Sequence, residues 1–381
     1  MDLSGNWNYP TPIRLGVGRI AEIVDACQEA GMKSPLLVTD RGLASMDITK
    51  NTLALLQNAG LKAAMFSAVD SNPSDVNVDE GLEVYRSGGF DGVIGFGGGS
   101  ALDISKVLAL MVKQTHPLWD FEDVGDNWTR ANADLIDPVI AVPTTAGTGS
   151  EVGRASIITN SSTHEKKIIF HPKMLPVAVI ADPELTVGMP QFLTAGTGLD
   201  AFAHCVEAFS SPHYHPMSQG IALEGMRLVK EYLPIAYADG ANIEARTHMM
   251  SAAAMGATAF QKGLGAIHAL SHPIGAVHNT HHGTTNAVCM PAVLKFNQAK
   301  IEVLFDRAAA YLSIEGGFNG FCAYVDQLNE SMNIPKTLTG LGVVDANVMA
   351  LTASALQDPS VGGNPVDMNA ANTQALIESI L

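Results

Sequence analysis

The chain has 381 residues, more than one ordinary domain needs and enough for two. Hydrophobic residues make up 47% and charged residues 16%, which is typical of a globular protein with large cores and excludes a disordered chain. The formal net charge of −16 argues against a nucleic acid or an anionic membrane surface as a partner.

Cysteine use points to a reducing compartment. The four cysteines, Cys27, Cys205, Cys289 and Cys322, are far apart and form no CxxC pair. The opening residues MDLSGNWNYPTPIRLG show no secretory pattern, and we find no apolar run long enough to span a bilayer. We therefore expect free thiols and a cytoplasmic protein.

The first half of the chain alternates short apolar runs with helical patterns. Strands are predicted at 35–39 (PLLVT), 92–96 (GVIGF), 139–142 (VIAV) and 177–181 (VAVIA). Helices are predicted at 45–59, 79–87 and 101–112, and a hairpin around a polar turn at 159–170. Strands that are apolar on both faces and separated by helices predict a parallel α/β sheet.

The pattern changes near residue 186. From Thr194 onward the chain is helical in periodicity and rich in alanine, and the stretches 249–256 and 265–275 are typical of tightly packed helices. We therefore expect an α/β nucleotide-binding domain at 1–185 and a helical domain at 186–381, with a cleft between them.

Two polar loops follow predicted strands. Gly97, Gly98, Gly99 and Ser100 open a helix, where glycines let a phosphate approach the helix N-terminus; alone, this turn fits a tight connection without a ligand equally well. The loop at 143–151 (PTTAGTGSE) adds hydroxyls and amides for ribose and phosphate oxygens. Both loops are predicted at the carboxyl edge of one sheet, which favours nucleotide binding.

Asp40 ends the strand LLVTD. A carboxylate at a strand tip can accept a hydrogen bond from a ribose 2′-OH and repels a 2′-phosphate, so it favours NAD over NADP. Here it precedes the glycine loop in sequence, the reverse of the usual order.

Histidines gather in the second half, where nine of the twelve lie from His204 to His282. Asp200 and His204 are spaced i, i+4 in a predicted helix, and so are His268 and His272, so each pair shares a helical face. Single residues of this kind are usually satisfied core or surface groups. Several buried in apolar helices need a partner, and a metal supplies one. Carboxylate with imidazole suits Fe(II), Zn(II) or Mn(II).

With these motifs the sequence resembles a known family, the iron-dependent (group III) alcohol dehydrogenases, which include propanediol oxidoreductases, butanol dehydrogenases and 4-hydroxybutyrate dehydrogenases. The matching motifs run over nearly the whole chain: NPSDVNVDEG at 72–81, GGGSALDISK at 97–106, PTTAGTGSEV at 143–152, DPELT at 182–186, TAGTGLDAFAH at 194–204 and GLGAIHALSHPIGAVHNTHHGTTNAV at 263–288.

The resemblance implies a Rossmann-like N-terminal domain, an all-helical C-terminal domain (the dehydroquinate synthase-like fold) and a site in the cleft. It implies the metal ligands Asp200, His204, His268 and His282, with His272 beside the metal as an active-site histidine. The NAD contacts that it implies are Asp40, Gly97, Gly98, Gly99, Ser100, Asp103, Thr144, Thr145, Thr148 and Lys166. We also expect a homodimer or a larger homo-oligomer.

The chain departs from the family pattern near the expected substrate pocket. It reads SEVGRA at 150–155, with Arg154 beside Gly153, and FQKGLG at 260–265, with Lys262 in place of a small residue. His278 and His281 are also additional. We predict that Lys262, with Arg154, favours a small alcohol or aldehyde with an anionic tail, such as 4-hydroxybutyrate. An internal carboxylate partner or exposure to solvent would equally satisfy the lysine.

The expected reaction is hydride transfer between NAD(H) and a small primary alcohol or aldehyde, assisted by the metal as a Lewis acid. The proton passes through His272, the ribose hydroxyls or water. Two alternatives remain: a sugar-phosphate enzyme of the dehydroquinate-synthase-like group, and a non-catalytic or filament-forming nucleotide- and metal-binding protein. The sequence stretches that contain the predicted metal ligands carry few of the Lys, Arg and Asn residues that would bind a phosphate group of a substrate.

Overall fold

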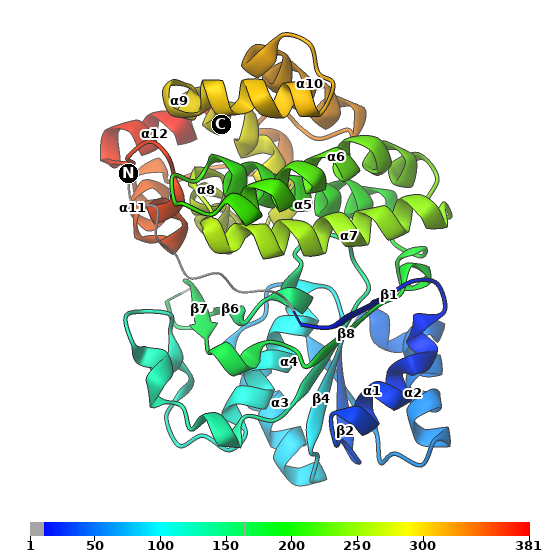
Figure 1. Cartoon of the computed structure of the whole chain (residues 1–381). Coiled ribbons are helices and arrows are strands. Elements are labelled where there is room, and N and C mark those ends of the chain that lie inside the picture. The colour runs from blue at the N-terminus through cyan, green and yellow to red at the C-terminus, as the bar shows by residue number, and fades with distance from the viewer. Residues whose placement is uncertain (1–10, 164) are drawn as a thin grey trace. The chain divides into compact units, whose positions relative to one another are not determined.

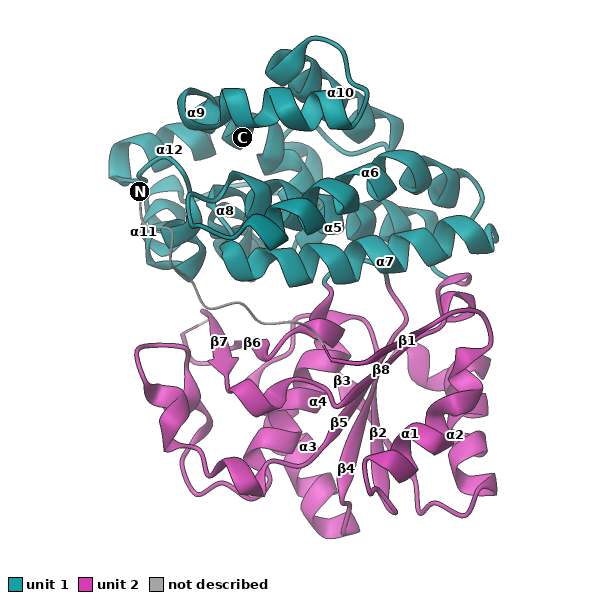
Figure 2. Ribbon diagram, in the orientation of Figure 1, with its two compact units in different colours: residues 1–9, 146–148, 189–381 teal, residues 10–145, 149–188 magenta. Residues whose placement is uncertain are grey.

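The computed structural model describes residues 11–163 and 165–381. Their contacts divide the described chain into two compact units, coloured separately in Figure 2. Unit 2 comprises 11–145 and 149–188, and unit 1 comprises 146–148 and 189–381. Three residues of the threonine loop therefore pack with the helical unit rather than with the sheet.

Unit 2 is built on a six-stranded sheet whose strand pairs are all parallel, in the order β1-β8-β5-β4-β2-β3. Its strands are β1 (Ile13–Leu15), β2 (Pro35–Asp40), β3 (Ala64–Val69), β4 (Gly92–Gly97), β5 (Val139–Pro143) and β8 (Ala178–Ala181). Its α-helices are α1 (Ile23–Glu29), α2 (Asp47–Asn58), α3 (Asp75–Gly88) and α4 (Gly99–Met111).

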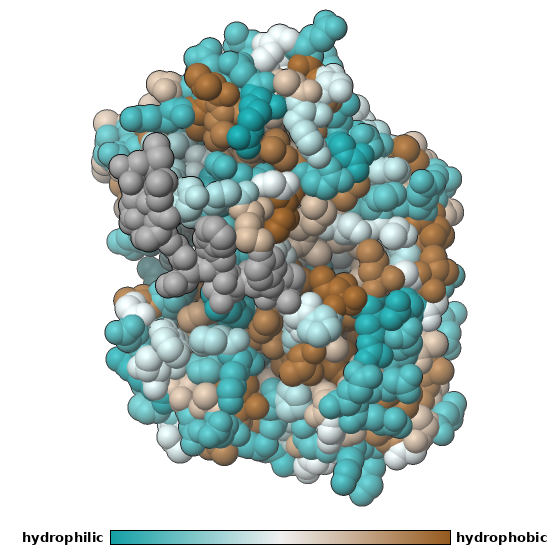
Figure 3. Space-filling model, viewed as in Figure 1, coloured by the Kyte–Doolittle hydropathy of each residue, from teal (hydrophilic) through white to brown (hydrophobic). Residues whose placement is uncertain are grey.

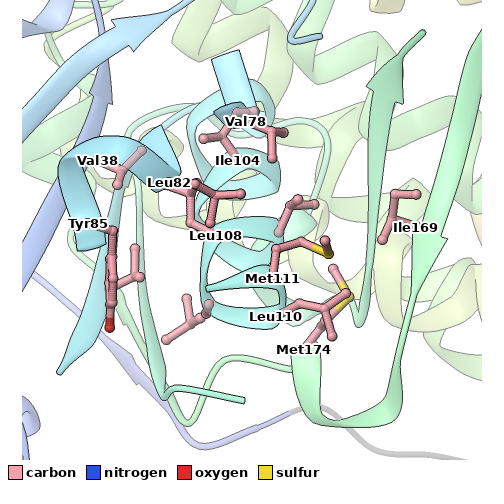
Figure 4. Packing of buried hydrophobic residues seen from close by; sticks show 14 of the residues in the cluster. Val38, Val78, Leu82, Tyr85, Ile104, Leu108, Leu110, Met111, Ile169 and Met174 are labelled. Atoms are coloured by element: carbon pink, nitrogen blue, oxygen red, sulfur yellow. The ribbon is translucent and has the colours of Figure 1, made fainter. Parts of the chain in front are cut away.

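Helices cover both faces of this sheet, α3 and α4 on one and α1 and α2 on the other (Figure 1). Alternate residues of a strand point to opposite faces, so Leu36 and Val38 of β2 enter one core while Leu37 enters the other. Figure 4 shows the first core, where Leu82 and Tyr85 of α3 pack with Leu108 of α4. The predicted strands that are apolar on both faces are thus confirmed.

A two-stranded antiparallel ribbon, β6 (Ala155–Thr159) and β7 (Lys166–Phe170), is added to unit 2. The hairpin predicted at 159–170 exists, but its first strand begins four residues earlier, at Ala155. The strands β1 and β3 and the short helix α1 are additions to the sequence prediction.

Unit 1 is helical in its described residues, as predicted. Its α-helices are α5 (Gln191–Ser210), α6 (Pro216–Ala238), α7 (Ile243–Ala259), α8 (Ala266–His278), α9 (His282–Tyr311), α10 (Gly317–Ser331), α11 (Val348–Gln357) and α12 (Ala370–Ile380). Helix α5 packs against α6, α7 and α9 and is buried on all sides from Thr194 to Ser210 (Figure 1). None of the described helices is long and apolar enough to cross a membrane.

Candidate metal centre and nucleotide site

The buried helix α5 carries two of the predicted metal ligands on one face. Asp200 and His204 are 2% and 4% exposed, and Nε2 of His204 lies 3.7 Å from Oδ1 of Asp200. Helices that are apolar on every side belong in a protein core, where an ionised group is costly unless it has a partner. The surroundings of Asp200 therefore decide what this face can do.

Two further helices bring imidazoles to the same carboxylate. Nε2 of His268, from α8, lies 3.8 Å from Asp200 Oδ1, and Nε2 of His282, at the first residue of α9, lies 3.5 Å from it. Donor atoms of Asp200, His204 and His268 all lie within 4.8 Å of one another. The structure thus brings together the four side chains predicted as ligands.

Glycine at 283 permits this convergence. A Cβ atom there would lie 2.0 Å from the main-chain oxygen of Gly196 in α5 and 2.9 Å from Cβ of Asp200. Any side chain would therefore push the start of α9 away from α5. This close approach of two backbones holds His282 beside Asp200.

Burial and neighbouring charges act in opposite directions on the pKa values of this cluster. Burial alone would raise the pKa of Asp200, but the charges that His204, His282 and His268 can carry outweigh it and hold the pKa far below its ordinary value. Burial lowers the pKa of His204 to about 4, leaving a neutral imidazole. Burial opposes the protonation of His268 as well, yet Glu207 and Asp200 together raise its pKa to about 10.

Asn286 of α9 marks the point where the acceptors converge. Its Nδ2 donates to Asp200 Oδ1 at 2.8 Å and lies 3.2 Å from Nε2 of both His268 and His282. An amide group has two N–H bonds for these three acceptor atoms. Nδ1 of His204 is buried without a hydrogen-bond partner among the described residues. Three acceptor atoms that share one amide group fit a divalent metal with borderline ligand preferences.

Glu207 is a site residue that sequence reasoning missed. It lies one turn beyond His204 on α5 and is 4% exposed. Its Oε2 lies 2.5 Å from Nδ1 of His268, and its Oε1 accepts a hydrogen bond from the main-chain N–H of Ile267 at 2.6 Å. A glutamate three residues after His204, inside an otherwise apolar helix, was the available signal.

His272 lies beside the cluster without approaching Asp200. Its ring stacks on that of His282 with centroids 5.3 Å apart and meets the His268 ring at 5.6 Å. Nδ1 of His272 lies 2.7 Å from Oδ2 of Asp358, while its Nε2 is buried without a hydrogen-bond partner among the described residues. Asp358, also missed, is 86 residues away in sequence, and no local pattern links the two.

The structure gives Lys262 partners other than a substrate. The side chain is buried, and Nζ donates to the main-chain oxygens of Ala208, Phe209 and Ser211 at 3.1, 3.1 and 2.5 Å. All three ammonium protons are thus used at the C-terminal end of α5, where helix carbonyls attract a cation. This geometry favours a structural role for Lys262 over the predicted contact with the anionic tail of a substrate.

Several predicted nucleotide residues of unit 2 lie at the carboxyl ends of three neighbouring strands. Asp40 ends β2, Gly97 ends β4, and Thr144 and Thr145 follow β5. A Cβ at Gly97 would lie 3.6 Å from Oδ2 of Asp40, so the carboxylate lies beside the glycine-rich turn. This edge of a parallel sheet is where α/β folds bind nucleotides.

The glycine-rich turn leads directly into α4. Gly97 has a φ of +151°, and a Cβ there would come within 2.8 Å of the Ala101 Cβ. Gly98 is the N-cap, and among the described residues no side chain caps the helix. Gly99 and Ser100 form the first turn, whose main-chain N–H groups are suited to a phosphate.

The remaining predicted cofactor residues, and Arg154, lie in different parts of the two units. Asp103 of α4 accepts hydrogen bonds from Ser150 Oγ at 2.5 Å and from the main-chain N–H of Ile157 at 2.9 Å, so its carboxylate already has protein partners. Lys166 is the first residue of β7, and Thr148 belongs to unit 1. Arg154 lies over the ring of Phe170 at 5.4 Å, within unit 2.

Comparison with known proteins identifies two family models that match the chain. The family model described as "Iron-containing alcohol dehydrogenase" matches residues 10–183, and the model "Fe-containing alcohol dehydrogenase family, C-terminal" matches residues 194–381. Together they span both units of the chain.

Full-length relatives point the same way. The chain is 37% identical to 4-hydroxybutyrate dehydrogenase of Cupriavidus necator, covering 97% of this chain and 98% of that protein. The crystal structure of a 1,3-propanediol oxidoreductase superposes with a TM-score of 0.93 at 33% identity, covering 99% and 100% of the two chains. Sulfoacetaldehyde reductase of Bifidobacterium kashiwanohense, solved with NAD+, gives a TM-score of 0.88 at 27% identity, covering 99% of each. The chain therefore belongs to the iron-containing alcohol dehydrogenase family and is an NAD-dependent oxidoreductase.

Proposed function

We propose that the protein transfers a hydride between NAD(H) and a small primary alcohol or aldehyde, with Asp200, His204, His268 and His282 holding a divalent iron ion. The observation that carries the proposal is the convergence of one carboxylate oxygen and two imidazole nitrogens on Asn286 Nδ2. Family membership favours this reaction over a sugar-phosphate chemistry or a non-catalytic role.

In the oxidation direction, hydride leaves the alcohol carbon for NAD+, and the hydroxyl proton leaves separately, which gives an aldehyde. A bound divalent metal supplies Lewis acidity that stabilises negative charge on the substrate oxygen. His272 offers Nε2 as the acceptor for the proton, because its Nδ1 is held by Asp358. Phe260, whose ring meets that of His204 with centroids 5.0 Å apart, gives this region an apolar wall.

In this proposal the α/β domain, predicted at residues 1–185, binds NAD. The helical domain, predicted at residues 186–381, binds the metal and carries out catalysis. The N-terminus of α4 would receive the cofactor's phosphates, and Thr144, Thr145 and Asp40 would receive its ribose oxygens. The other predicted contacts with NAD are Gly97, Gly98, Gly99, Ser100, Asp103, Thr148 and Lys166.

For the substrate we propose a short ω-hydroxy acid such as 4-hydroxybutyrate, supported by the 37% identical relative of that activity. The test is an anaerobic screen of Fe(II)-loaded protein with 4-hydroxybutyrate, 1-butanol and 1,3-propanediol, followed by NADH absorbance. If 1-butanol were oxidised and 4-hydroxybutyrate were not, the proposed preference for an anionic substrate would be wrong. No turnover of any alcohol or aldehyde at full metal loading would contradict the proposed reaction.

We also propose a cytoplasmic homo-oligomer. Its support is the exposed apolar edge of the sheet: within the described chain β1 is an edge strand, and Ile13, Val17 and Val177 are 39%, 55% and 47% exposed. Hydrophobic residues reach the surface where β1 lies (Figure 3). An apolar edge strand tends to pair with another chain. Light scattering on the purified protein would measure the state, and a monomer would contradict it.

Asp40 should make the enzyme prefer NAD(H). Its Oδ1 accepts hydrogen bonds from the main-chain N–H groups of Gly42 and Leu43, a turn that asparagine preserves. Asp40→Asn therefore removes only the charge, and we expect the kcat/KM ratio of NADP(H) to NAD(H) to rise about tenfold, equivalent to about 1.4 kcal/mol. Asp40→Gly should raise it as well. Asp134→Asn, at an exposed position of the same unit, should leave the ratio unchanged. A wild-type preference for NADP(H) would contradict the assignment.

Lys262→Met should lower stability without changing substrate choice. The carbonyl oxygens of Ala208, Phe209 and Ser211 lose their buried donor, which we expect to cost about 1–3 kcal/mol and to lower Tm by several degrees. The ratio of kcat/KM for 4-hydroxybutyrate to that for 1-butanol should stay as in wild type. A fall of about tenfold or more in that ratio would show instead that Lys262 interacts with the charged group of the substrate.

A further inference from the structure

Glu207 contacts two donors of different kinds. Its Oε1 accepts a hydrogen bond from a main-chain N–H, that of Ile267 in the first turn of α8, at 2.6 Å. Its Oε2 lies 2.5 Å from Nδ1 of His268 in the same turn. A main-chain N–H can only donate, so the first contact fixes the orientation of the carboxyl group.

This arrangement determines which nitrogen of His268 carries the ring proton. A carboxylate oxygen accepts, so the proton between the two groups belongs to Nδ1. Nδ1 therefore keeps its proton when His268 is neutral, and the lone pair that a metal requires then lies on Nε2. That nitrogen lies 3.8 Å from Asp200 Oδ1 and 3.2 Å from Asn286 Nδ2, on the side of the proposed ligands.

The end of α8 that carries His268 is also held by a second acceptor. Oδ1 of Asn364 accepts from the main-chain N–H of Ala266 at 3.1 Å and from Nδ2 of Asn297 at 2.9 Å. A Cβ at residue 265 would lie 2.9 Å from this Oδ1 and 3.2 Å from Oε1 of Glu207, so glycine keeps both acceptors close. The N-terminal end of a helix also stabilises a carboxylate.

We propose that Glu207 is a positioning residue of the metal centre, which holds His268 as the Nδ1–H tautomer and thereby sets the affinity for the metal. The inference rests on the proposed function, because it takes His268 as a ligand. Glu207 is not itself a ligand, since both of its oxygens are directed at the α8 donors. Outer carboxylates of this kind typically change metal affinity by about 10–100-fold when they are removed.

Glu207→Gln tests the tautomer directly. The amide oxygen of glutamine must face the Ile267 N–H, so its NH2 group faces Nδ1 of His268. Two donors then oppose each other whenever the ring proton sits on Nδ1, which is the form that binds a metal through Nε2. We expect about 10–100-fold weaker affinity for Co(II) and Zn(II), measured by competition with a chelator of known affinity. Glu207→Asp, which keeps the charge, should recover part of the loss.

A matched control separates this effect from general loosening of the helix. Lys262→Met disturbs the same end of α5, where Nζ holds the oxygens of Ala208 and Phe209, but it leaves the imidazole contact intact. It should lower the Tm of the metal-free protein while the metal affinity stays near that of wild type. An equal loss of affinity in Lys262→Met and Glu207→Gln would overturn the proposal.

A second measurement needs no variant at Glu207. In Zn(II)-loaded, 15N-histidine-labelled wild type, we expect a downfield Nδ1–H proton signal from His268, bonded to the carboxylate. Its absence would overturn the proposal even if Glu207→Gln does not fold. If a folded Glu207→Gln protein bound the metal as tightly as wild type, the positioning role of Glu207 would be wrong, whereas the proposed metal site would still be supported. A wild type that binds neither ion would instead contradict the proposed function.

Discussion

Replacing Asp200 by alanine should abolish turnover and remove the bound metal, while unit 2 stays folded. The carboxylate lies within 3.5–3.8 Å of an imidazole nitrogen from each of His204, His268 and His282, and it is the negative charge that these residues share. The neighbouring imidazoles hold its pKa far below the ordinary value, so it is ionised at neutral pH. Loss of several kcal/mol of transition-state stabilisation corresponds to about a thousandfold or more in kcat.

The measurement is metal content per chain by inductively coupled plasma mass spectrometry, made together with kcat. His268→Ala should give the same result. His248→Ala is the matched control, because this histidine stacks on Tyr232 with centroids 3.9 Å apart, on other helices of the same unit. It should retain wild-type metal and activity. NADH binding by fluorescence should persist in all three variants. Wild-type occupancy in Asp200→Ala or His268→Ala would remove that residue from the ligand set.

The parts of the fold that could be predicted follow from periodicity. Strands β2, β4 and β5 are buried along their apolar runs, and such runs separated by helices predict a parallel sheet. Strand β3 was missed because its residues, AMFSAV, include small ones and only two of the six are fully buried. Edge strands are short of contacts on one side and therefore carry a weaker hydrophobic pattern.

The site was predictable where its geometry is local. The i, i+4 spacing of Asp200 and His204 places both on one helical face through the helix repeat itself. The partner carboxylates were not predictable in this way. Glu207 reaches His268 across 61 residues of sequence and Asp358 reaches His272 across 86, and only tertiary packing determines such pairs.

Lys262 shows how little sequence spacing alone says about the direction of a side chain. Its place six residues before His268 predicted a side chain near the substrate. The chain turns at η9 (Phe260–Lys262), and the side chain runs back to the C-terminal end of α5. Distance along a sequence carries no information about direction, and a buried ammonium takes whichever carbonyl oxygens are closest.

His272→Ala should lower kcat by about a hundredfold or more and leave the metal in place, because general acid–base groups contribute about 10²–10⁴-fold. Its ring stacks on that of His282, so it lies at the cluster, and its Nδ1 is directed at Asp358 rather than at Asp200. Metal content close to wild type, with KM changed far less than kcat, is the expected signature. A loss of metal equal to that in Asp200→Ala would make His272 a ligand.

Asp358→Asn extends this test to the partner carboxylate. Oδ1 of Asp358 accepts from the main-chain N–H of Ser360 at 2.8 Å, so the asparagine oxygen stays there and its NH2 group faces His272 Nδ1. The ring proton then moves to Nε2, the atom that must accept, and kcat should fall about tenfold or more. The double variant should be no slower than His272→Ala alone, because Asp358 acts through His272. Asp367→Asn, exposed in the same segment, should match wild type. Additive losses in the double variant would show that Asp358 acts independently of the imidazole.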